Sequence, residues 1–339
     1  MVKAVVFGAA LALVIPGIAS ASTTATVAAP AASSWTSPGN GALLKSNAQC
    51  DSGLVSSGGL NVTNASGDTN QQKDAVHIME TTPSNDGLGE EDGTNVDDTY
   101  WLGYGGTGNN ATGHYTIQPF AVCFTNSVVN HTQVVVNSTT GPNSANAMAS
   151  VTATCPSGTR LLGGDAQSIL AGNRSVKVIG SFPSNSFGSA TAAGGTNPTS
   201  WTAVALNGNQ AVSGDETTAY AVCSGSGIDV SGVTVTVKHT NVSGPTSADS
   251  SQQATSSDCG TDGNLISGGA SISGGDPTTS SFATPGSSGD HLNGDYPSSD
   301  SSGTPTSDGN SPSTWTAIGH TGGQSSANTY TDVWGLCMN

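Results

Sequence analysis

The stretch that decides the fold is Cys155-Pro-Ser-Gly-Thr-Arg-Leu-Leu-Gly-Gly164, followed by Phe182-Pro183, by Trp201-Thr-Ala-Val-Ala205 and by Thr218-Ala-Tyr-Ala-Val-Cys223. The same order of cysteine, paired glycines, proline, tryptophan and second cysteine recurs twice more in the chain. The spacing from proline to tryptophan and the spacing from tryptophan to closing cysteine are identical in every copy, at Pro83, Trp101 and Cys123, at Pro183, Trp201 and Cys223, and at Pro297, Trp315 and Cys337. Self-similarity at a fixed period indicates internal repeats. The chain therefore contains three units of about 100 residues each.

Strands are the secondary structure that the units favour. Short runs of alternating apolar and polar residues, separated by Gly, Pro, Asn and Ser, are typical of strands joined by turns. In the middle unit they predict strands at Val151–Cys155, Thr159–Leu162, Ser175–Phe182, Trp201–Leu206 and Thr217–Cys223. An aromatic residue precedes the closing cysteine by three residues in each unit, at Phe120, Tyr220 and Trp334. No convincing amphipathic helix follows residue 21, so we predict an all-β protein.

The paired glycines mark a recurring backbone feature. Aligned by their second members, Gly59 and Gly164 lie at the same distance after the first cysteine of their units, and Gly269 lies one position further on. Glycines inside a strand indicate a bend, a bulge or a close backbone approach. The pairs Gly58-Gly59, Gly163-Gly164 and Gly268-Gly269 lack the strand, G-x-G-x-x-G and helix context of a phosphate-binding loop.

Six cysteines fall two per unit. Of the fifteen possible pairings, the repeat favours one disulfide in each unit, namely Cys50–Cys123, Cys155–Cys223 and Cys259–Cys337. A metal site built from these cysteines is disfavoured because the sequence has no C-x-x-C pair and no closely spaced His/Cys cluster. Structural disulfides persist in oxidising compartments, which indicates a protein that acts outside the cytoplasm.

The first residues support that location. Lys3 precedes an apolar run from Ala4 to Ile18, and Ala19-Ser20-Ala21 has the form of a signal-peptidase site. We therefore expect a signal peptide at residues 1–21, with an uncleaved anchor as the alternative, and no membrane segment after it. The three β repeats are then expected at residues 22–125, 126–225 and 226–339, and the protein is expected to be secreted.

Charge narrows the possible partners. Lys and Arg total 7 against 23 acidic residues, the formal net charge is −16, and no Lys or Arg follows Cys259. Nucleic-acid binding requires cations that face phosphates, so we predict that the protein does not bind nucleic acid. An anionic membrane surface is disfavoured for the same reason.

The acidic segment between Pro83 and Trp101 is the best candidate for a binding site. It carries Asp86, Glu90, Glu91, Asp92, Asp97 and Asp98 and no basic residue. Clustered carboxylates on a flexible loop suit calcium, and extracellular calcium is abundant enough for weak sites. We therefore consider a calcium site formed by Asp86, Glu90, Asp92, Asp97 and Asp98, although the loop lacks the EF-hand pattern; a solvated acidic loop is the alternative. No other cofactor is expected.

The three repeated tryptophans have two interpretations. Trp101, Trp201 and Trp315 are expected to pack in the core beside the disulfides, and the alternative is an exposed platform for sugar rings. The six histidines share no position between units, and neither a G-x-S-x-G nor an H-E-x-x-H motif is present. We therefore expect no enzymatic activity.

The middle unit resembles a module that is common in secreted bacterial, especially actinobacterial, proteins. The shared pattern is a Cys-Pro-x-Gly start, a Gly-Gly turn, a Tyr/Phe-Pro, a Trp strand and a Tyr-Ala-Val-Cys end. The third unit keeps Tyr296-Pro297 and Trp315, whereas the first has Thr82-Pro83 in place of the aromatic-proline pair. This resemblance implies an extracellular location and no particular reaction. Three Cys-Gly-Gly-Cys units in one chain are also similar to threefold β-prism proteins such as vitelline membrane outer layer protein and jacalin-like lectins, whose repeats are shorter.

Two arrangements fit three disulfide-stapled β units. They are separate β-sandwich-like beads, which the length of each unit slightly favours, or three sheets around a pseudo-threefold axis. The frame is constant while the loops between proline and tryptophan change in chemistry, an arrangement typical of a scaffold that presents surface. We expect a secreted, non-enzymatic structural or surface-interaction protein that self-associates in an extracellular layer or filament. The alternative is a carbohydrate-binding module whose Pro-to-Trp loops contact extracellular glycans.

Overall fold

The computed structural model describes residues 22–36, 43–64, 76–93, 97–108, 114–169, 176–209 and 213–339. The expected signal peptide at residues 1–21 lies outside them. In the described parts of the chain, all regular structure is antiparallel β apart from the short 3-10 turn η2 (Gly260–Asp262). The all-β prediction is confirmed. No helix in these ranges has the length and hydrophobicity that crossing a bilayer requires.

The strands form three sheets, which we call A, B and C. Sheet A has the order β1 (Thr23–Ala28), β7 (His114–Asn126), β4 (Leu54–Asn64), β17 (His291–Ser298), β18 (Thr314–His320) and β15 (Ser251–Thr255), with β2 (Ser33–Thr36) also paired to β7. Sheet B has the order β3 (Leu43–Gln49), β6 (Tyr100–Thr107), β5 (Val76–Ser84), β10 (Leu161–Ile169), β13 (Glu216–Ser224) and β8 (Thr132–Thr140). Sheet C has the order β14 (Val235–Ser243), β19 (Tyr330–Met338), β16 (Asn264–Ser273), β11 (Val176–Ser184), β12 (Ser200–Asn207) and β9 (Met148–Thr154).

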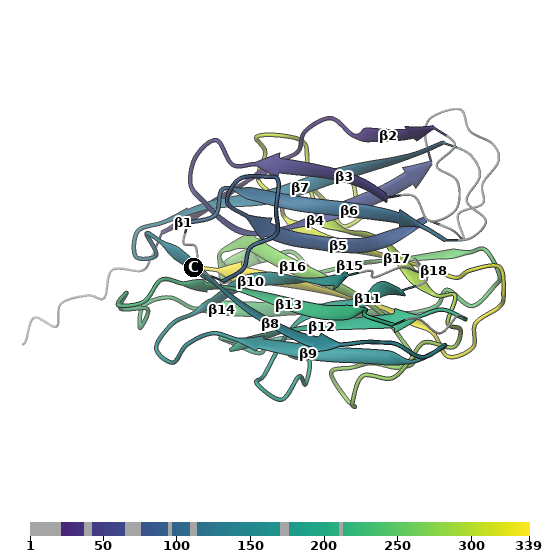
Figure 1. Ribbon diagram of the computed structural model, residues 1–339. Coiled ribbons are helices and arrows are strands. Elements are labelled where there is room, and N and C mark those ends of the chain that lie inside the picture. Colours follow the sequence, from purple (N-terminus) through teal and green to yellow (C-terminus); the bar gives the residue numbers. More distant parts are fainter. Residues whose placement is uncertain are drawn as a thin grey trace, which may run out of the picture.

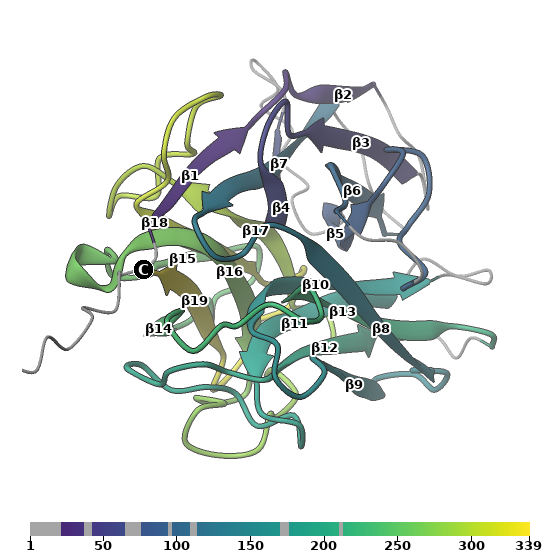
Figure 2. The same ribbon diagram turned by 90° about the vertical axis from the view of Figure 1, so that its left-hand side faces the viewer.

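Every sheet is shared between two repeats. The middle repeat places β8, β10 and β13 in sheet B and β9, β11 and β12 in sheet C, and the other two repeats divide their strands in the same way. The central pairs β4–β17, β5–β10 and β11–β16 each join two repeats. Figure 1 shows strands distant in the sequence lying side by side, and Figure 2 shows the three sheets around a common interior.

The prism-like arrangement is therefore the correct one, and the slight preference for separate beads is wrong. Each repeat supplies three strands, or four for repeat one in sheet A, to each of two sheets. The inner strand of such a half-sheet would have an unpaired edge. Pairing with the half-sheet of another repeat satisfies this edge. The preference for separate beads was based on the length of each unit and on the disulfide within it. Neither feature carries information about strand pairing between units.

Each glycine pair lies beside a β-bulge. The register shifts between Val55 and Ser57 in β4, between Leu161 and Gly163 in β10 and between Leu265 and Ser267 in β16. The interpretation of the pairs as bend or bulge devices is confirmed.

One glycine of each pair allows a tryptophan to lie directly on the backbone. A Cβ at Gly58, Gly164 or Gly268 would overlap the indole ring of Trp101, Trp201 or Trp315 in the same repeat. These three glycines are the equivalent ones, so aligning Gly164 with Gly59 and Gly269 was wrong by one position. The residue that follows is Gly59 in repeat one, Gly269 in repeat three and Asp165 in repeat two.

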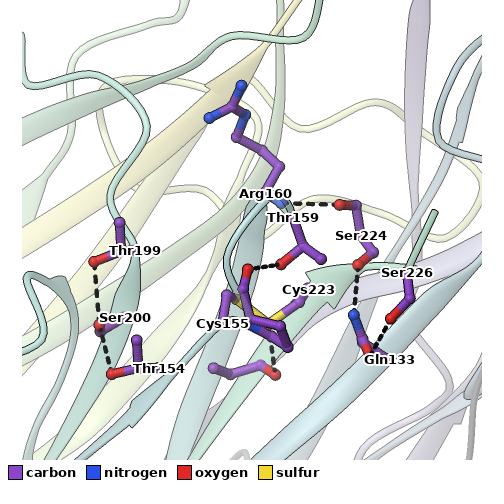
Figure 3. The surroundings of a disulfide bond; sticks show 12 residues. Gln133, Thr154, Cys155, Thr159, Arg160, Thr199, Ser200, Cys223, Ser224 and Ser226 are labelled. Carbon is purple, nitrogen blue, oxygen red and sulfur yellow. Dashed lines mark hydrogen bonds between the residues drawn. A yellow bond between two sulfur atoms is a disulfide. The ribbon is translucent and has the colours of Figure 1, made fainter. Parts of the chain in front are cut away.

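The predicted disulfides and core aromatic residues are present. Cys50–Cys123, Cys155–Cys223 and Cys259–Cys337 all form, which confirms the pairing. Figure 3 shows the middle bridge, where the backbone nitrogen of Arg160 donates a hydrogen bond of 2.8 Å to Ser224 Oγ next to the cystine. The aromatic residues three positions before each closing cysteine are also buried, namely Phe120, Tyr220 and Trp334.

Candidate functional site

A cleft in sheet B combines residues of repeats one and two. Its volume is about 240 Å³, and its lining comes from β3, β5, β6, β10 and the acidic segment: Leu43, Met79, Glu80, Glu90, Tyr104, Gln167 and Ser168. A concave site lined by apolar groups and a few convergent polar groups is the usual form of a small-ligand site. We take this cleft as the candidate functional site.

Strand pairing between repeats positions the central polar pair. Glu80 follows a bulge in β5 and lies opposite Gln167 of β10. Gln167 Nε2 donates to Glu80 Oε2 at 2.8 Å, and Tyr220 Oη donates to Gln167 Oε1 at 2.7 Å. The tyrosine thus fixes the orientation of the amide, and the amide fixes the carboxyl group. Nothing in the sequence pointed to this hydrogen-bond chain, because its members lie on three strands from two different repeats.

The electrostatics of the cleft favour a neutral acid. Burial, together with the nearby carboxylate of Glu90, raises the pKa of Glu80 to about 8. Tyr104 Oη donates to Glu90 Oε1 at 3.0 Å, and burial and these carboxyl groups also raise the pKa of Tyr104. At neutral pH Glu80 therefore retains its proton, while its Oε1 accepts a hydrogen bond from Thr82 Oγ1 at 3.1 Å.

The acidic segment does not assemble the predicted calcium ligands in its described part. Asp86 Oδ1 accepts hydrogen bonds from the backbone nitrogens of Leu88 and Gly89 at 2.7 and 3.0 Å, so it caps its own turn. Asp97 Oδ1 accepts from the Thr132 nitrogen at 2.7 Å, at the start of β8. Glu90 faces Tyr104 in the cleft.

The other two predicted ligands also lie apart. Asp92 is exposed, whereas Asp98 is buried, and burial beside Glu91 raises the pKa of Asp98 to about 8. Among the described residues, these carboxylates form no group of three with converging ligand atoms. Residues 94–96 of the segment lie outside the described ranges, so calcium binding stays a prediction.

The repeated tryptophans belong to the core. Trp101, Trp201 and Trp315 are each 0% exposed, so their rings present no face to a ligand. Trp201 Nε1 donates to Ser181 Oγ at 2.9 Å, and Trp315 Nε1 donates to Asp295 Oδ1 at 2.5 Å. The core interpretation is confirmed, and the platform alternative is wrong.

Basic side chains do share a position between repeats, which corrects the conclusion drawn about the histidines. His77, Lys177 and His291 each lie six positions before the proline of their repeat, and all three are buried. The rings of His77 and His291 are 5.9 Å apart, and the ring of His320 is 5.1 Å from that of His291. Counting back from the proline would have revealed this position, but the residues there differ in chemistry.

Burial and mutual repulsion act on this group of bases. Burial lowers the pKa of Lys177 to about 8. The pKa of His291 lies well below its usual value because of burial and the neighbouring His320, Lys177 and His77. Burial therefore favours the neutral form of both Lys177 and His291.

Two buried carboxyl groups also escaped the sequence analysis. Asp165 accepts hydrogen bonds from Thr81 Oγ1 and, at 2.5 Å, from Ser181 Oγ. Burial and the adjacent Asp295 raise the pKa of Asp165 well above its usual value, and burial raises the pKa of Asp295 to about 8. Both groups are 3% exposed and act as neutral hydrogen-bonding groups of the core.

Neither a scan against protein-family models nor a search of the curated proteins finds a match to this chain.

Proposed function

We propose that the protein is a secreted, non-enzymatic structural protein that self-associates through the edges of its sheets. The recurring tryptophans, glycines and cysteines are internal, which supports a scaffold role for the repeat. All six cysteines are paired in disulfides, which fits an oxidising compartment outside the cytoplasm.

The observation that carries the proposal is an uncharged pair of edge strands. β8 is an edge of sheet B and β9 is an edge of sheet C. Their sequences, Thr132–Thr140 and Met148–Thr154, contain no charged residue. Natural proteins commonly place lysine or another charge on an edge strand to prevent pairing with a second molecule. Asn137 Nδ2 donates to the Thr152 carbonyl at 2.8 Å, so the two edges meet at one corner of the prism.

The test is to place charges on these edges. Thr140 and Ser150 are exposed in β8 and β9, so the Thr140→Lys/Ser150→Lys variant adds two cations without entering the core. Sedimentation velocity over a concentration series and negative-stain microscopy should show assemblies of the parent protein that the variant fails to form. The control is Ser157→Lys, an exposed position in a turn. A parent that stays monomeric at all concentrations, or a variant that assembles equally well, would contradict the proposal.

Carbohydrate binding is the second candidate, and the sheet B cleft is the observation that favours it. The cleft adjoins the Pro-to-Trp segment of repeat one through Glu90. It offers a neutral carboxylic acid, an amide and a tyrosine ring, groups that suit the hydroxyl and C–H faces of a sugar. Lys45 Nζ lies 4.9 Å from the centre of the Tyr104 ring and covers one of its faces.

A glycan array separates this candidate from self-association. Specific glycans should bind the parent protein, and Gln167→Ala should lose that binding while keeping the parent's assembly state. An array with no signal, or a signal that Gln167→Ala retains, would exclude the cleft as a sugar site.

A further inference from the structure

We propose that repeat three binds a zinc-class divalent transition metal through His239, Asp276 and Asp332. Each of these residues offers one ligand atom, and the three atoms lie within 4.8 Å of one another. The residues come from β14, from the loop after β16 and from β19, respectively. This site is separate from the sheet B cleft and from the acidic segment of repeat one, and it does not depend on the proposed function.

His239 and Asp332 are separated by the distance expected between two ligand atoms of one metal ion. His239 Nε2 lies 3.2 Å from Asp332 Oδ1. Zinc binds histidine nitrogen and carboxylate oxygen at about 2.0–2.2 Å, and two such ligands separated by an angle of about 100° are about 3.2 Å apart. A metal can therefore replace the proton between these two atoms without a change in their separation.

A set of hydrogen bonds holds the buried carboxylate in place. Asp332 is 0% exposed. Its Oδ1 accepts from Asn241 Nδ2 at 2.5 Å, and its Oδ2 accepts from Ser271 Oγ at 3.2 Å and Ser273 Oγ at 3.0 Å. Ligating carboxylates in metal centres are oriented by such outer hydrogen bonds.

The loop between β16 and β17 provides the third ligand. Asp276 begins a turn in which its Oδ1 accepts hydrogen bonds from the Thr278 nitrogen at 2.8 Å and from Thr278 Oγ1 at 2.6 Å. Further along the same loop, Phe282 stacks on Phe182 of β11 with ring centres 5.7 Å apart, which fixes the loop against sheet C.

An aromatic wall continues from that contact to the histidine. Phe182 stacks on Trp334 at 5.2 Å, and Trp334 lies 4.8 Å from the ring of His239. The wall excludes water from one side of the cluster, which strengthens charge interactions there.

Charge supplies an independent argument for a cation. In the described part of the chain, neither Asp276 nor Asp332 forms an ion pair with a lysine or arginine, and the nearby Lys238 is paired with Asp262 at 2.6 Å. Two carboxylates that converge at a partly buried point repel each other unless a cation lies between them. The sequence after Cys259 contains no Lys or Arg to take this role.

The cluster is specific to repeat three. His239 lies opposite Trp334, and in repeat two the corresponding partner of Tyr220 is Val136. Asp332, five positions before the closing cysteine, corresponds to Thr218. The repeated frame does not require these side chains, so the scaffold alone does not explain them.

The ligand types select the class of metal. One imidazole and two carboxylates supply nitrogen and oxygen donors of the types that zinc binds, and zinc sites with three protein ligands complete their coordination with water. Calcium prefers six to eight oxygen ligands and gains little from an imidazole. We therefore expect zinc to bind and calcium not to bind at this cluster.

Thermal unfolding of metal-free protein without a histidine tag tests the proposal, with ZnCl2 or CaCl2 added. At a zinc concentration about 100 times the Kd, Tm should rise by about 4 °C for a chain of this size. Asp276→Asn keeps the acceptor for Thr278 and should lower zinc affinity at least about 100-fold, as measured by calorimetry. The control His131→Ala removes a histidine that is remote from the cluster and should leave zinc affinity unchanged.

Cobalt gives a readout that is independent of stability. CoCl2 should produce visible absorption bands of a four- or five-coordinate site in the parent protein, and zinc should abolish them. His239→Gln should remove these bands even if Asp276→Asn fails to fold. No zinc-dependent shift in the parent protein, or zinc and cobalt signals that both ligand variants retain, would overturn the proposal.

Discussion

Replacing Asp295 by asparagine is expected to change the pH dependence of stability in a defined direction. Burial raises the pKa of Asp295 to about 8, and the pKa of Asp165 next to it is raised well above its usual value. Asparagine keeps the size of the side chain and an oxygen that accepts the hydrogen bond from Trp315 Nε1. The main effect of the change is therefore the loss of one proton-binding group in the core.

The direction in which stability changes with pH depends on whether the folded or the unfolded state holds the proton of Asp295. Between about pH 4 and pH 8 the folded protein keeps Asp295 protonated, whereas the unfolded chain releases that proton. A carboxyl group whose pKa is raised in this way contributes stability that is fully present below about pH 4 and is lost as the pH rises through about 8. The loss amounts to about 1.4 kcal/mol for each pH unit. Between pH 5 and pH 7 the parent should therefore lose about 3 kcal/mol from this group, and Asp295→Asn should not.

Urea unfolding of both proteins at pH 5, 6 and 7 measures this difference. The stability of the variant relative to the parent should improve by about 3 kcal/mol from pH 5 to pH 7. Groups outside this pair titrate in both proteins, so their contributions cancel. Asp51→Asn, which removes an exposed carboxylate, is the matched control for lost negative charge. A stability difference that is the same at all three pH values would show that Asp295 is ionised in the core, and would refute the reasoning.

Three further predictions concern the scaffold. Gly164→Ala should destabilise the protein by more than about 3 kcal/mol in urea unfolding, because its Cβ would overlap Trp201 and the Tyr220 carbonyl. The control Gly232→Ala adds a Cβ that meets nothing within 4 Å and should stay within about 0.5 kcal/mol of the parent. Equal effects of the two substitutions would show that the tryptophan does not lie on the glycine. Cys155→Ala/Cys223→Ala removes a disulfide whose cysteines have a sequence separation of 68, and it should lower the free energy of unfolding by about 4 kcal/mol. The variant should still unfold in one transition that includes all three repeats. Independent melting of the middle repeat would contradict the shared sheets. Residues 126–225 expressed alone as a monomer should show no cooperative unfolding when it is followed by Trp201 fluorescence, because the inner edges of β10 and β11 lack their partners. A cooperative transition of the monomer would mean that the repeat is an independent domain.

The sequence was informative where the fold requires the same residue three times. The frame of Pro183, Trp201 and Cys223 predicted the disulfides, the buried tryptophans and the number of units, because packing on the cystine tolerates little variation. Glycines that lie against a tryptophan were also recognisable as backbone devices. Their exact register was not, because the glycine pair of the middle repeat is shifted by one position. Asp165 stands where the other repeats have Gly59 and Gly269, and Gly163 stands where they have Ser57 and Ser267.

Features that depend on contacts between repeats were not predictable. Pairing of Gln167 with Glu80 joins two units, and nothing in either segment specifies its partner. The candidate cleft therefore escaped the sequence analysis although Glu90 was singled out. The cluster of His239 and Asp332 escaped for a related reason, since their side chains meet across neighbouring strands that are distant in the sequence. Such sites become visible only once the strand order is known.

Small-angle X-ray scattering of residues 22–339, extrapolated to the dilution at which the protein is monomeric, tests the central claim that three repeats share three sheets. A single closed body of this length should have a radius of gyration of about 20 Å. Three separate domains in a row, each with a radius of gyration of about 13 Å, would give about 30 Å. The shared sheets predict the smaller of these two values for the whole chain, and a measurement close to the larger value would contradict them.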